Sequence, residues 1–354
     1  MTDLFLKVKI QQEQQLPFVL YCKPNSENIV GVFQKNDHLY FLENFEEKGF
    51  VFAPFDADEI PLIPLEHSDV YVENFLSEEF FFEDHTSKYN TSTGKDSFEE
   101  LVAKAVEAIK DNQFLKVVLS RKEEIAILNF DIEITIKKMI ALYSNAFNYC
   151  FFHPKIGTWI GATPEQFLKA NGNAIKTVAL AGTQLANNAA PAVWQDKEAE
   201  EQQLVTDFIV ESLNYVVKEI TISSPYAFQA GNLLHIKTDI SAILKSKKSL
   251  KKIIAALHPT AAVCGLPKET AKEFILKNER YKREYYSGFL GEFNIDLVSF
   301  KNIQTDLFVN LRCMKITKDK AQLFIGCGIT KDSIPEDEYK ETVYKSMTMK
   351  KIIN

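Results

Sequence analysis

The sequence predicts an α+β fold in which large antiparallel β-sheets are flanked by helices. Strand-like runs follow one another without an intervening helix between 286 and 329, which is typical of antiparallel neighbours. Helix-like segments occur elsewhere, but the regular strand-helix-strand spacing of a parallel sheet is missing. With 354 residues, 46% of them hydrophobic, the chain can bury a large core.

The region from Leu4 to about Phe82 is typical of strands joined by turns. Apolar runs such as LPFVLYC and HLYFLENF alternate with polar stretches such as KPNSEN and QKNDH. The polar stretch HTSKYNTSTGKD follows and predicts a loop near residue 95. Ser97 and Glu100 then have the spacing of a capping box, so we expect a helix to open at Ser97.

Beyond residue 115, strands and helices both occur. The runs KVVLS, NYCFF, TWIGA, LFVNLRCM and QLFIG predict strands. Helical periodicity predicts helices over 131–143, 197–218, 248–257, 268–278 and 336–352. Neither G-x-G-x-x-G after a strand nor G-x-x-x-x-G-K-[ST] occurs, so a nucleotide-binding fold has no support.

Charge and cysteine content exclude several classes of protein. The net charge of -7 provides no diffuse positive field for a nucleic acid, so nucleic acid is not expected as a partner. Five cysteines without C-x-x-C spacing fit a reducing compartment. The N-terminus lacks a signal peptide pattern, and no run approaches the roughly 20 apolar residues needed to span a bilayer. We therefore expect a cytoplasmic protein with no membrane partner.

The last helix carries an informative spacing. Glu338, Glu341 and Lys345 fall at i, i+3 and i+7, which places them on one helical face. Glu341 and Lys345 could simply form an ion pair on a solvated surface. Just upstream, the strand LFIGCGIT ends in Gly326 and Gly328, and glycines there let a ligand approach the backbone. This face could therefore contribute to a metal site.

A second acidic cluster lies in the helix from about Lys197. Glu198 and Glu201 are spaced i, i+3, and they too could be ordinary surface charges. If the two carboxylate pairs met, they would offer oxygen ligands suited to Mg²⁺. Because no histidine or cysteine accompanies them, zinc is disfavoured.

Five further residues have types and positions that suggest chemistry. Lys116 and Arg312 lie in apolar strands, where burial could turn the lysine into a base and let the arginine clamp a carboxylate. Either could instead reach the surface or pair with a nearby glutamate. Glu165 follows a G-A-T-P turn and is either a turn cap or a general acid. His235 and His258 lie in apolar surroundings, where a histidine is usually a satisfied core residue.

Many segments, in order, resemble the chorismate-utilising enzymes, a family that contains anthranilate, aminodeoxychorismate, salicylate and isochorismate synthases. The resemblance runs from about Ser97 to the C-terminus. The matching segments are KVVLSR (116–121), GATPEQF (161–167), VALAGT (178–183), LLHIKT (233–238), LHPTAAVCGLP (257–267), E-R-x-x-R-x-Y-Y-x-G (279–288), Arg312, GCGI (326–329) and E-x-x-E-x-x-x-K (338–345).

The resemblance implies a role for each matching residue. Lys116 is similar to the family's general base, which takes a proton from the water that attacks C2 of chorismate. Glu165 is similar to the general acid, which protonates the departing C4 hydroxyl, and His235 to a histidine that faces the ring. Glu201 and Glu341 match the two carboxylates that bind Mg²⁺. Glu198 and Glu338 match two glutamates that reach the ion through water.

The same resemblance implies how the substrate is held. Arg312 and Tyr286 match the pair that binds the enolpyruvyl carboxylate. The remaining matches line the substrate site: Gly182, Thr183, Gly326 and Lys345. The family's fold, that of anthranilate synthase component I, implies a strand-rich N-terminal region over 1–95 that is integral to the fold, and a chorismate-binding catalytic region over 96–354. It also implies an active site in a central cleft.

Two small residues indicate the subtype. Ala181 stands where aminating relatives commonly have a lysine, so water remains the natural nucleophile. Ala262 stands where salicylate synthases usually have a threonine that favours loss of pyruvate. The resemblance therefore implies an isochorismate synthase, an isomerase feeding menaquinone or siderophore biosynthesis. Salicylate synthase and a non-catalytic chorismate-binding protein are the alternatives. We expect no glutaminase subunit, and a monomer or weak dimer.

Overall fold

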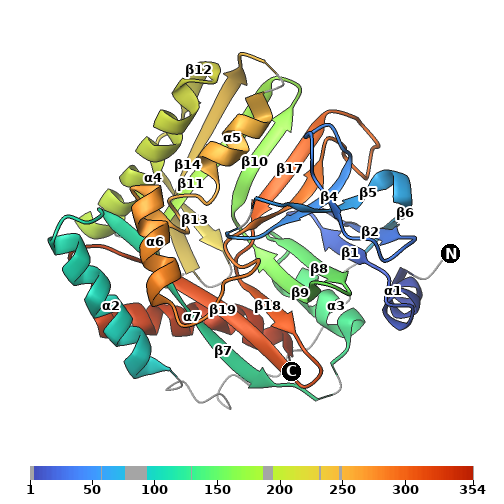
Figure 1. Cartoon of the computed structure of the whole chain (residues 1–354), viewed down its shortest axis with the longest axis horizontal. Helices are drawn as coiled ribbons and strands as arrows, with labels where there is room; N and C mark the ends of the chain where they lie inside the picture. Colours follow the sequence, from blue (N-terminus) through green and yellow to red (C-terminus); the bar gives the residue numbers. More distant parts are fainter. Residues whose placement is uncertain are drawn as a thin grey trace.

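Two large antiparallel sheets pack face to face, with helices on their outer faces (Figure 1). This arrangement is seen in a computed structural model of the chain, which describes residues 4–56, 58–75, 94–128, 130–185, 194–230, 233–246 and 249–353. Every strand pairing in these residues is antiparallel, which confirms the predicted fold class. None of the helices in this part of the chain is long and apolar enough to cross a membrane.

The first sheet has nine strands. Their order is β15 (Gly265–Leu266), β7 (Lys116–Ala126), β19 (Lys320–Ile329), β18 (Cys313–Ile316), β9 (Gly157–Thr163), β8 (Phe147–His153), β1 (Phe18–Cys22), β2 (Asn28–Gln34) and β6 (Ser68–Asn74). The N-terminal strands β1, β2 and β6 thus belong to the same sheet as β18 and β19, and they join it through the pairing of β1 with β8.

The second sheet has ten strands. Their order is β12 (Val217–Ile222), β14 (Leu233–Leu244), β11 (Ala174–Leu185), β10 (Gln166–Asn171), β17 (Gln304–Val309), β16 (Phe289–Phe293), β4 (Gly49–Ala53), β5 (Pro61–Pro64) and β3 (Tyr40–Phe41), with β13 (Tyr226–Ala230) paired to β14. The strands predicted between 286 and 329 are β16 to β19, and they are divided between the two sheets.

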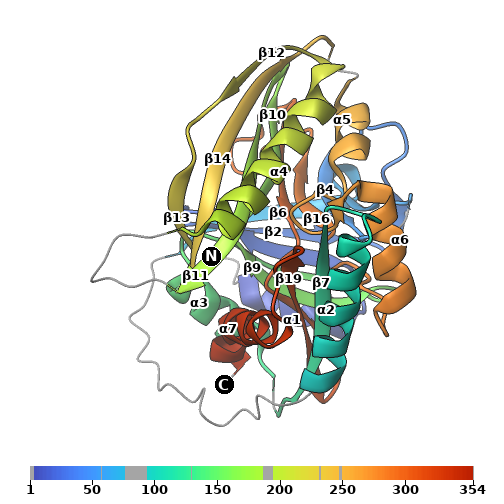
Figure 2. The ribbon, with the colours of Figure 1, turned by 90° about the vertical axis from the view of Figure 1, so that its left-hand side faces the viewer.

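The helices cover both outer faces. They are α1 (Leu4–Glu13), α2 (Lys95–Lys110), α3 (Ile132–Leu142), α4 (Asp196–Asn214), α5 (Ser249–Leu257), α6 (Lys268–Asn278) and α7 (Pro335–Ile353), with a 3-10 turn at Leu65–His67. Figure 2 shows α4 lying along β11 and β14 of the second sheet, while α7 packs on β19 of the first. These two helices carry the two predicted acidic clusters.

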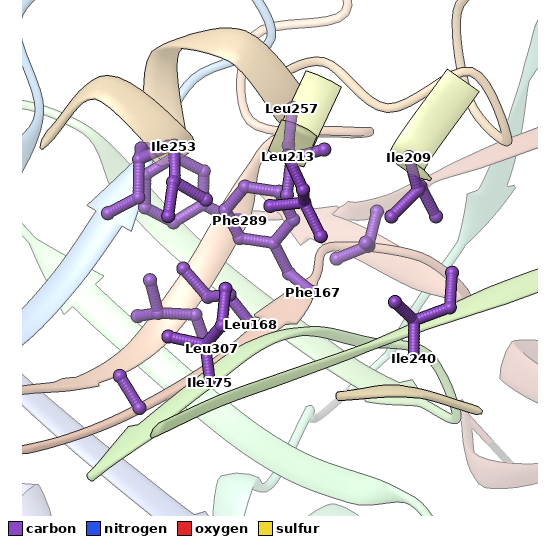
Figure 3. Close-up of a cluster of buried hydrophobic side chains, with 14 of the residues drawn as sticks. Phe167, Leu168, Ile175, Ile209, Leu213, Ile240, Ile253, Leu257, Phe289 and Leu307 are labelled. Carbon is purple, nitrogen blue, oxygen red and sulfur yellow. The ribbon is translucent and has the colours of Figure 1, made fainter. Parts of the chain in front are cut away.

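Continuous apolar runs form strands that are buried on both faces. In β1, Val19 and Tyr21 point into the core between the sheets, whereas Phe18 and Leu20 pack under the outer helices. The outer face of the second sheet has its own core against α4 and α5, where Phe167 and other labelled side chains meet (Figure 3). Packing on both faces removes the alternation of polar and apolar residues expected of a strand with one wet face.

Two of the points at which the chain crosses from one sheet to the other are adjacent. Pro164 and Glu165 connect β9 of the first sheet to β10 of the second, and Asn310 to Arg312 connect β17 to β18. The crossings are tied together, because Val309 N donates to Glu165 O at 3.0 Å. Beyond Phe324, β19 loses its β18 partner, since β18 pairs only as far as Cys313. The site forms at this opening.

Three sequence-based expectations were wrong in detail. Leu4 to Glu13 form a helix rather than a strand, because Leu4, Phe5 and Val8 make one apolar face that packs on the first sheet. The helix predicted to open at Ser97 begins at Lys95 instead, after Gly94, and no side chain caps it. The helix predicted over 197–218 ends at Asn214, because the β-branched segment from Val217 pairs with β14. Residues 76–93 lie outside the described residues; they include the end of the predicted strand-rich region and most of the predicted loop.

Candidate active site

A cavity lies at the crossings, between the two sheets and between α4 and α7. Twelve residues singled out from the sequence line it: Glu165, Ala181, Gly182, Thr183, Glu201, His235, Ala262, Tyr286, Arg312, Gly326, Glu341 and Lys345. Its free volume of about 90 Å³ is below the about 300 Å³ or more typical of ligand pockets. Entry of a ligand therefore requires lining side chains to make room.

Lys116 borders this cavity through its ion pair. Its side chain is fully buried on β7, and Nζ lies 2.8 Å from Oε1 of Glu201, a lining residue on α4. Gly328 of β19 makes room for this pair, because a methyl group there would overlap the Glu201 carboxylate and lie 3.2 Å from Lys116 Cε. Lys116 thus pairs with a glutamate, which was one of the alternatives predicted from the sequence. That glutamate, Glu201, lines the cavity.

Glu165 is a buried acid among cations. It is 4% exposed at the crossing from β9 to β10. Burial raises the pKa of its carboxyl to about 8, although the charges of Lys116, Lys345 and Arg312 act in the opposite direction. The group therefore holds its proton at neutral pH, which is the state required of a general acid.

His235 is held in one tautomer by two fixed partners. Opposite it, β11 has a bulge at Gly182 and Thr183, and Gly182 adopts a φ of 69° that favours glycine. His235 Nδ1 lies 2.9 Å from Gly182 O, and Nε2 lies 2.8 Å from an Arg312 Nη. Because a carbonyl only accepts and a guanidinium only donates, Nδ1 carries the proton and Nε2 accepts.

The electrostatics of this pair follow from burial. Burial, together with the charges of Arg312 and Lys345, holds the pKa of the His235 imidazole well below its usual range, so the ring is neutral. Burial lowers the pKa of the Arg312 guanidinium to about 10, which leaves it charged at neutral pH. Arg312 itself has a φ of 46° at the crossing from β17 to β18, an uncommon value for a residue with a side chain.

The opposite wall is formed by β19 and α7. Lys345 Nζ lies 2.6 Å from Glu341 Oε1 and donates to Gly326 O at 3.1 Å. The predicted surface pair therefore exists, but it faces the cavity at the open edge of β19. The Tyr286 hydroxyl approaches Gly326 closely, because a methyl group at Gly326 would lie 2.8 Å from that oxygen. Burial lowers the pKa of the Lys345 ammonium, but Glu341 outweighs this and raises it.

Glu201 and Glu341 come from different helices and line one cavity, so their carboxylates could together hold a magnesium ion. Mg²⁺ is usually held by one or two protein carboxylates and keeps several waters. Within the described ranges, no group of three or more His, Cys, Asp or Glu residues is placed to hold a metal. The fit therefore rests on these two carboxylates, completed by water and substrate oxygens.

The two other predicted metal-associated glutamates do not line the cavity. Glu198 closes the N-terminal cap of α4, where its Oε2 accepts from Gln195 N at 3.0 Å. Glu338 is buried on α7 beside Cys327, whose thiol donates to the Glu338 carbonyl. Glu198 lies beside Gly182, and Glu338 beside Cys327, and both of these neighbours line the cavity. That the two glutamates bind Mg²⁺ through water stays a prediction. His258 is half-buried and lies outside the cavity lining; its ring packs on Phe289, and Nε2 donates to Pro54 O at 2.9 Å.

Sequence reasoning missed several apolar residues of the cavity wall. These are Val118, Pro164, Leu180, Val263, Leu311, Phe324, Ile325 and Cys327. Strand alternation could have found two of them. Val118 is two residues from Lys116 on β7, and Phe324 is two residues from Gly326 on β19, so each shares a strand face with a residue already singled out.

Comparison with known proteins gives a family. A family model described as "Chorismate binding enzyme" matches residues 66–354. Isochorismate synthase EntC of Escherichia coli is 30% identical over 271 residues, which cover 72% of this chain and 66% of that protein. Isochorismate synthase MenF of Escherichia coli is 27% identical over 272 residues, which cover 73% of this chain and 60% of that protein. The chain thus spans less than two thirds of the length of these relatives.

The fold is also found in a solved structure. The menaquinone-specific isochorismate synthase MenF from Escherichia coli superposes with a TM-score of 0.75 at 20% sequence identity. The match covers 96% of this chain and 89% of that protein. At this identity, the likeness concerns the fold, including the described N-terminal strands.

Proposed function

Because the chain belongs to the chorismate-binding enzyme family, we propose that it is a magnesium-dependent isochorismate synthase. The observation that carries this proposal is the common cavity of a buried lysine and a protonated glutamate. Glu165 lines the cavity, and Lys116 borders it closely enough for its charge to act on the Glu165 carboxyl. An amine and an acid on the two sides of one cavity are what addition of water with loss of a hydroxyl needs.

In this proposal, the ammonium of Lys116, which is paired with Glu201, first gives up its proton. The neutral amine then accepts a proton from the water that attacks C2 of chorismate. Glu165 donates its proton to the C4 hydroxyl, which leaves as water. One water enters and one leaves, so the overall reaction is an isomerisation. The raised pKa of the Glu165 carboxyl supports this assignment, because the acid is loaded at neutral pH.

The substrate is an anion, and the cavity has cations to hold it. Arg312 and Tyr286 hold the enolpyruvyl carboxylate, with Thr183 and Lys345 beside them. His235 accepts from Arg312 and thereby sets the direction of its guanidinium. Mg²⁺, held by Glu201 and Glu341, would neutralise the ring carboxylate and orient the ring.

The subtype depends on two alanines in the cavity wall. Ala181 and Ala262 both line the cavity, and neither places a polar group against the ring. The alanine at 181 offers no amine to compete with water, and the alanine at 262 offers no hydroxyl to assist loss of pyruvate. Both support release of isochorismate rather than of salicylate.

Chromatography of the products formed from chorismate and Mg²⁺ tests the proposal. We expect isochorismate, no pyruvate in a lactate dehydrogenase assay, and loss of turnover on addition of EDTA. One pyruvate released per chorismate would instead indicate a salicylate synthase. No consumption of chorismate, with binding retained in calorimetry, would indicate a non-catalytic binding protein.

Two variants test the residue roles. Lys116→Ala and Glu165→Gln should each reduce kcat by at least about 100-fold. Lys122→Ala is a matched control, because Lys122 lies on the same strand with an exposed pair to Glu124. Wild-type rates in both site variants would refute the assignment of base and acid.

A further inference from the structure

A buried ion pair behind the cavity has no role in the mechanism above. Glu279 and Arg283 belong to the E-R-x-x-R motif, and neither lines the cavity. Yet they are only 8% and 4% exposed. Taking two charges out of water costs stability unless their bonds are well formed, so such a pair calls for an explanation.

The pair is well formed and reaches the strand that carries Lys116. Arg283 Nε donates to Glu279 Oε2 at 2.8 Å, and one Nη donates to Oε1 at 2.5 Å. The same Oε1 accepts from Ser120 N at 2.7 Å and from Ser120 Oγ at 2.8 Å. Ser120 lies on β7, four residues after Lys116. Glu279 is thus satisfied by Arg283, in the segment after α6, and by β7.

The rest of the guanidinium binds the cavity wall from behind. One Nη donates to Val263 O at 2.9 Å, and the other donates to Val118 O at 2.7 Å. Val118 and Val263 both line the cavity, on β7 and on the segment that also holds Ala262. Arg283 therefore joins two parts of the wall that lie more than 140 residues apart in sequence.

Two rings enclose the guanidinium. Its Cζ lies 4.6 Å from the centre of the Phe55 ring and 5.7 Å from the centre of the Tyr286 ring. Tyr286 lines the cavity. Only an arginine can bond a carboxylate with two nitrogens, reach two carbonyls and stack on rings, because lysine has one compact ammonium.

We propose that Arg283, held by Glu279, is a positioning residue that fixes the Lys116 strand against Val263 and Tyr286. It contacts no reacting group, and the inference rests on the proposed function. Its physical basis is the sensitivity of proton transfer to placement, since a displacement of about 1 Å can cost about 100-fold in rate. If the bonds of Arg283 were lost, the two wall segments that it joins would be free to move.

Arg283→Lys tests this, because it keeps the charge and loses the fork. We expect kcat to fall by about 10- to 100-fold, while KM for chorismate changes by less than about threefold. The small KM effect is expected because the cations that bind the substrate are held by other groups, Arg312 by His235 and Lys345 by Glu341 and Gly326. Arg283 reaches the substrate site only through its contact with the Tyr286 ring. A second readout does not need turnover: amide exchange should accelerate in residues 116–120 and 260–266.

Lys23→Gln is the control for lost stability. Lys23 forms a part-buried pair with Glu292 at 2.5 Å and with Asp296 at 2.9 Å, and none of the three lines the cavity. Both this variant and Arg283→Lys should unfold at lower urea concentration than wild type. Lys23→Gln should nevertheless keep the wild-type kcat and the wild-type exchange rates of the two wall segments. A fall in kcat in proportion to stability in both variants would overturn the positioning role.

Rescue by a small cation provides a second test. A surface pocket of about 270 Å³, lined by Phe55, Glu279 and Arg283 among others, gives solvent a route to the pair. In Arg283→Ala, guanidinium at non-denaturing concentration should restore part of kcat, whereas it should not restore Lys116→Ala. Unchanged kcat and unchanged amide exchange in Arg283→Lys would refute the inference. An inactive wild-type protein, together with accelerated amide exchange in Arg283→Lys, would refute only the proposed function.

Discussion

The proton held by Glu165 should be visible in the stability of the protein. The pKa of this carboxyl is raised from 4.5 to about 8, chiefly by burial. A raised pKa of an acid stabilises the folded state fully below pH 4.5, and this contribution is lost as pH rises through about 8. At about 1.36 kcal/mol per pKa unit, the loss amounts to up to about 5 kcal/mol. Glu165→Gln cannot lose a proton and removes this dependence.

Urea unfolding of both proteins, without ligand, between about pH 4.5 and about pH 9, measures the effect. The free energy of unfolding of Glu165→Gln relative to wild type should rise steadily across this interval. Glu211→Gln is the matched control, because Glu211 is an exposed carboxylate on α4 and its difference from wild type should stay small. A difference for Glu165→Gln that does not change with pH would refute the buried, protonated state, and with it the general acid.

The remaining predictions concern the cavity and the core. Gly328→Ala places a methyl group against the Glu201 carboxylate, so kcat/KM should fall by about 100-fold with the fold retained in circular dichroism. Glu201→Gln should weaken Mg²⁺ binding in calorimetry by about tenfold or more, whereas the exposed neighbour variant Glu200→Gln should bind Mg²⁺ normally. Glu123→Gln breaks a buried pair with Lys350 at 2.6 Å and should cost about 3–5 kcal/mol in urea unfolding; a cost below about 1 kcal/mol would contradict the buried pair.

The sequence alone determined the fold class and most of the polar residues that line the cavity. Antiparallel sheets follow from strands in succession, and apolar runs such as LPFVLYC follow from burial on both faces. Glu341 and Lys345 could be assigned to one helix face because helical spacing is fixed by backbone geometry. Lys116, Glu165 and Arg312 were recognised because a charge within an apolar strand, or at its end, requires a partner.

Tertiary structure alone decided which of these residues meet. No local sequence pattern predicts that Lys116 pairs with Glu201, because the two residues lie on β7 and α4, far apart in the chain. The same holds for Glu165 and Arg312, whose neighbouring positions arise from two crossings between the sheets. Local patterns also failed at Val217, where pairing with β14 overrides helical periodicity. Long-range packing sets these contacts and the charge state of Glu165, because burial is a property of the folded chain.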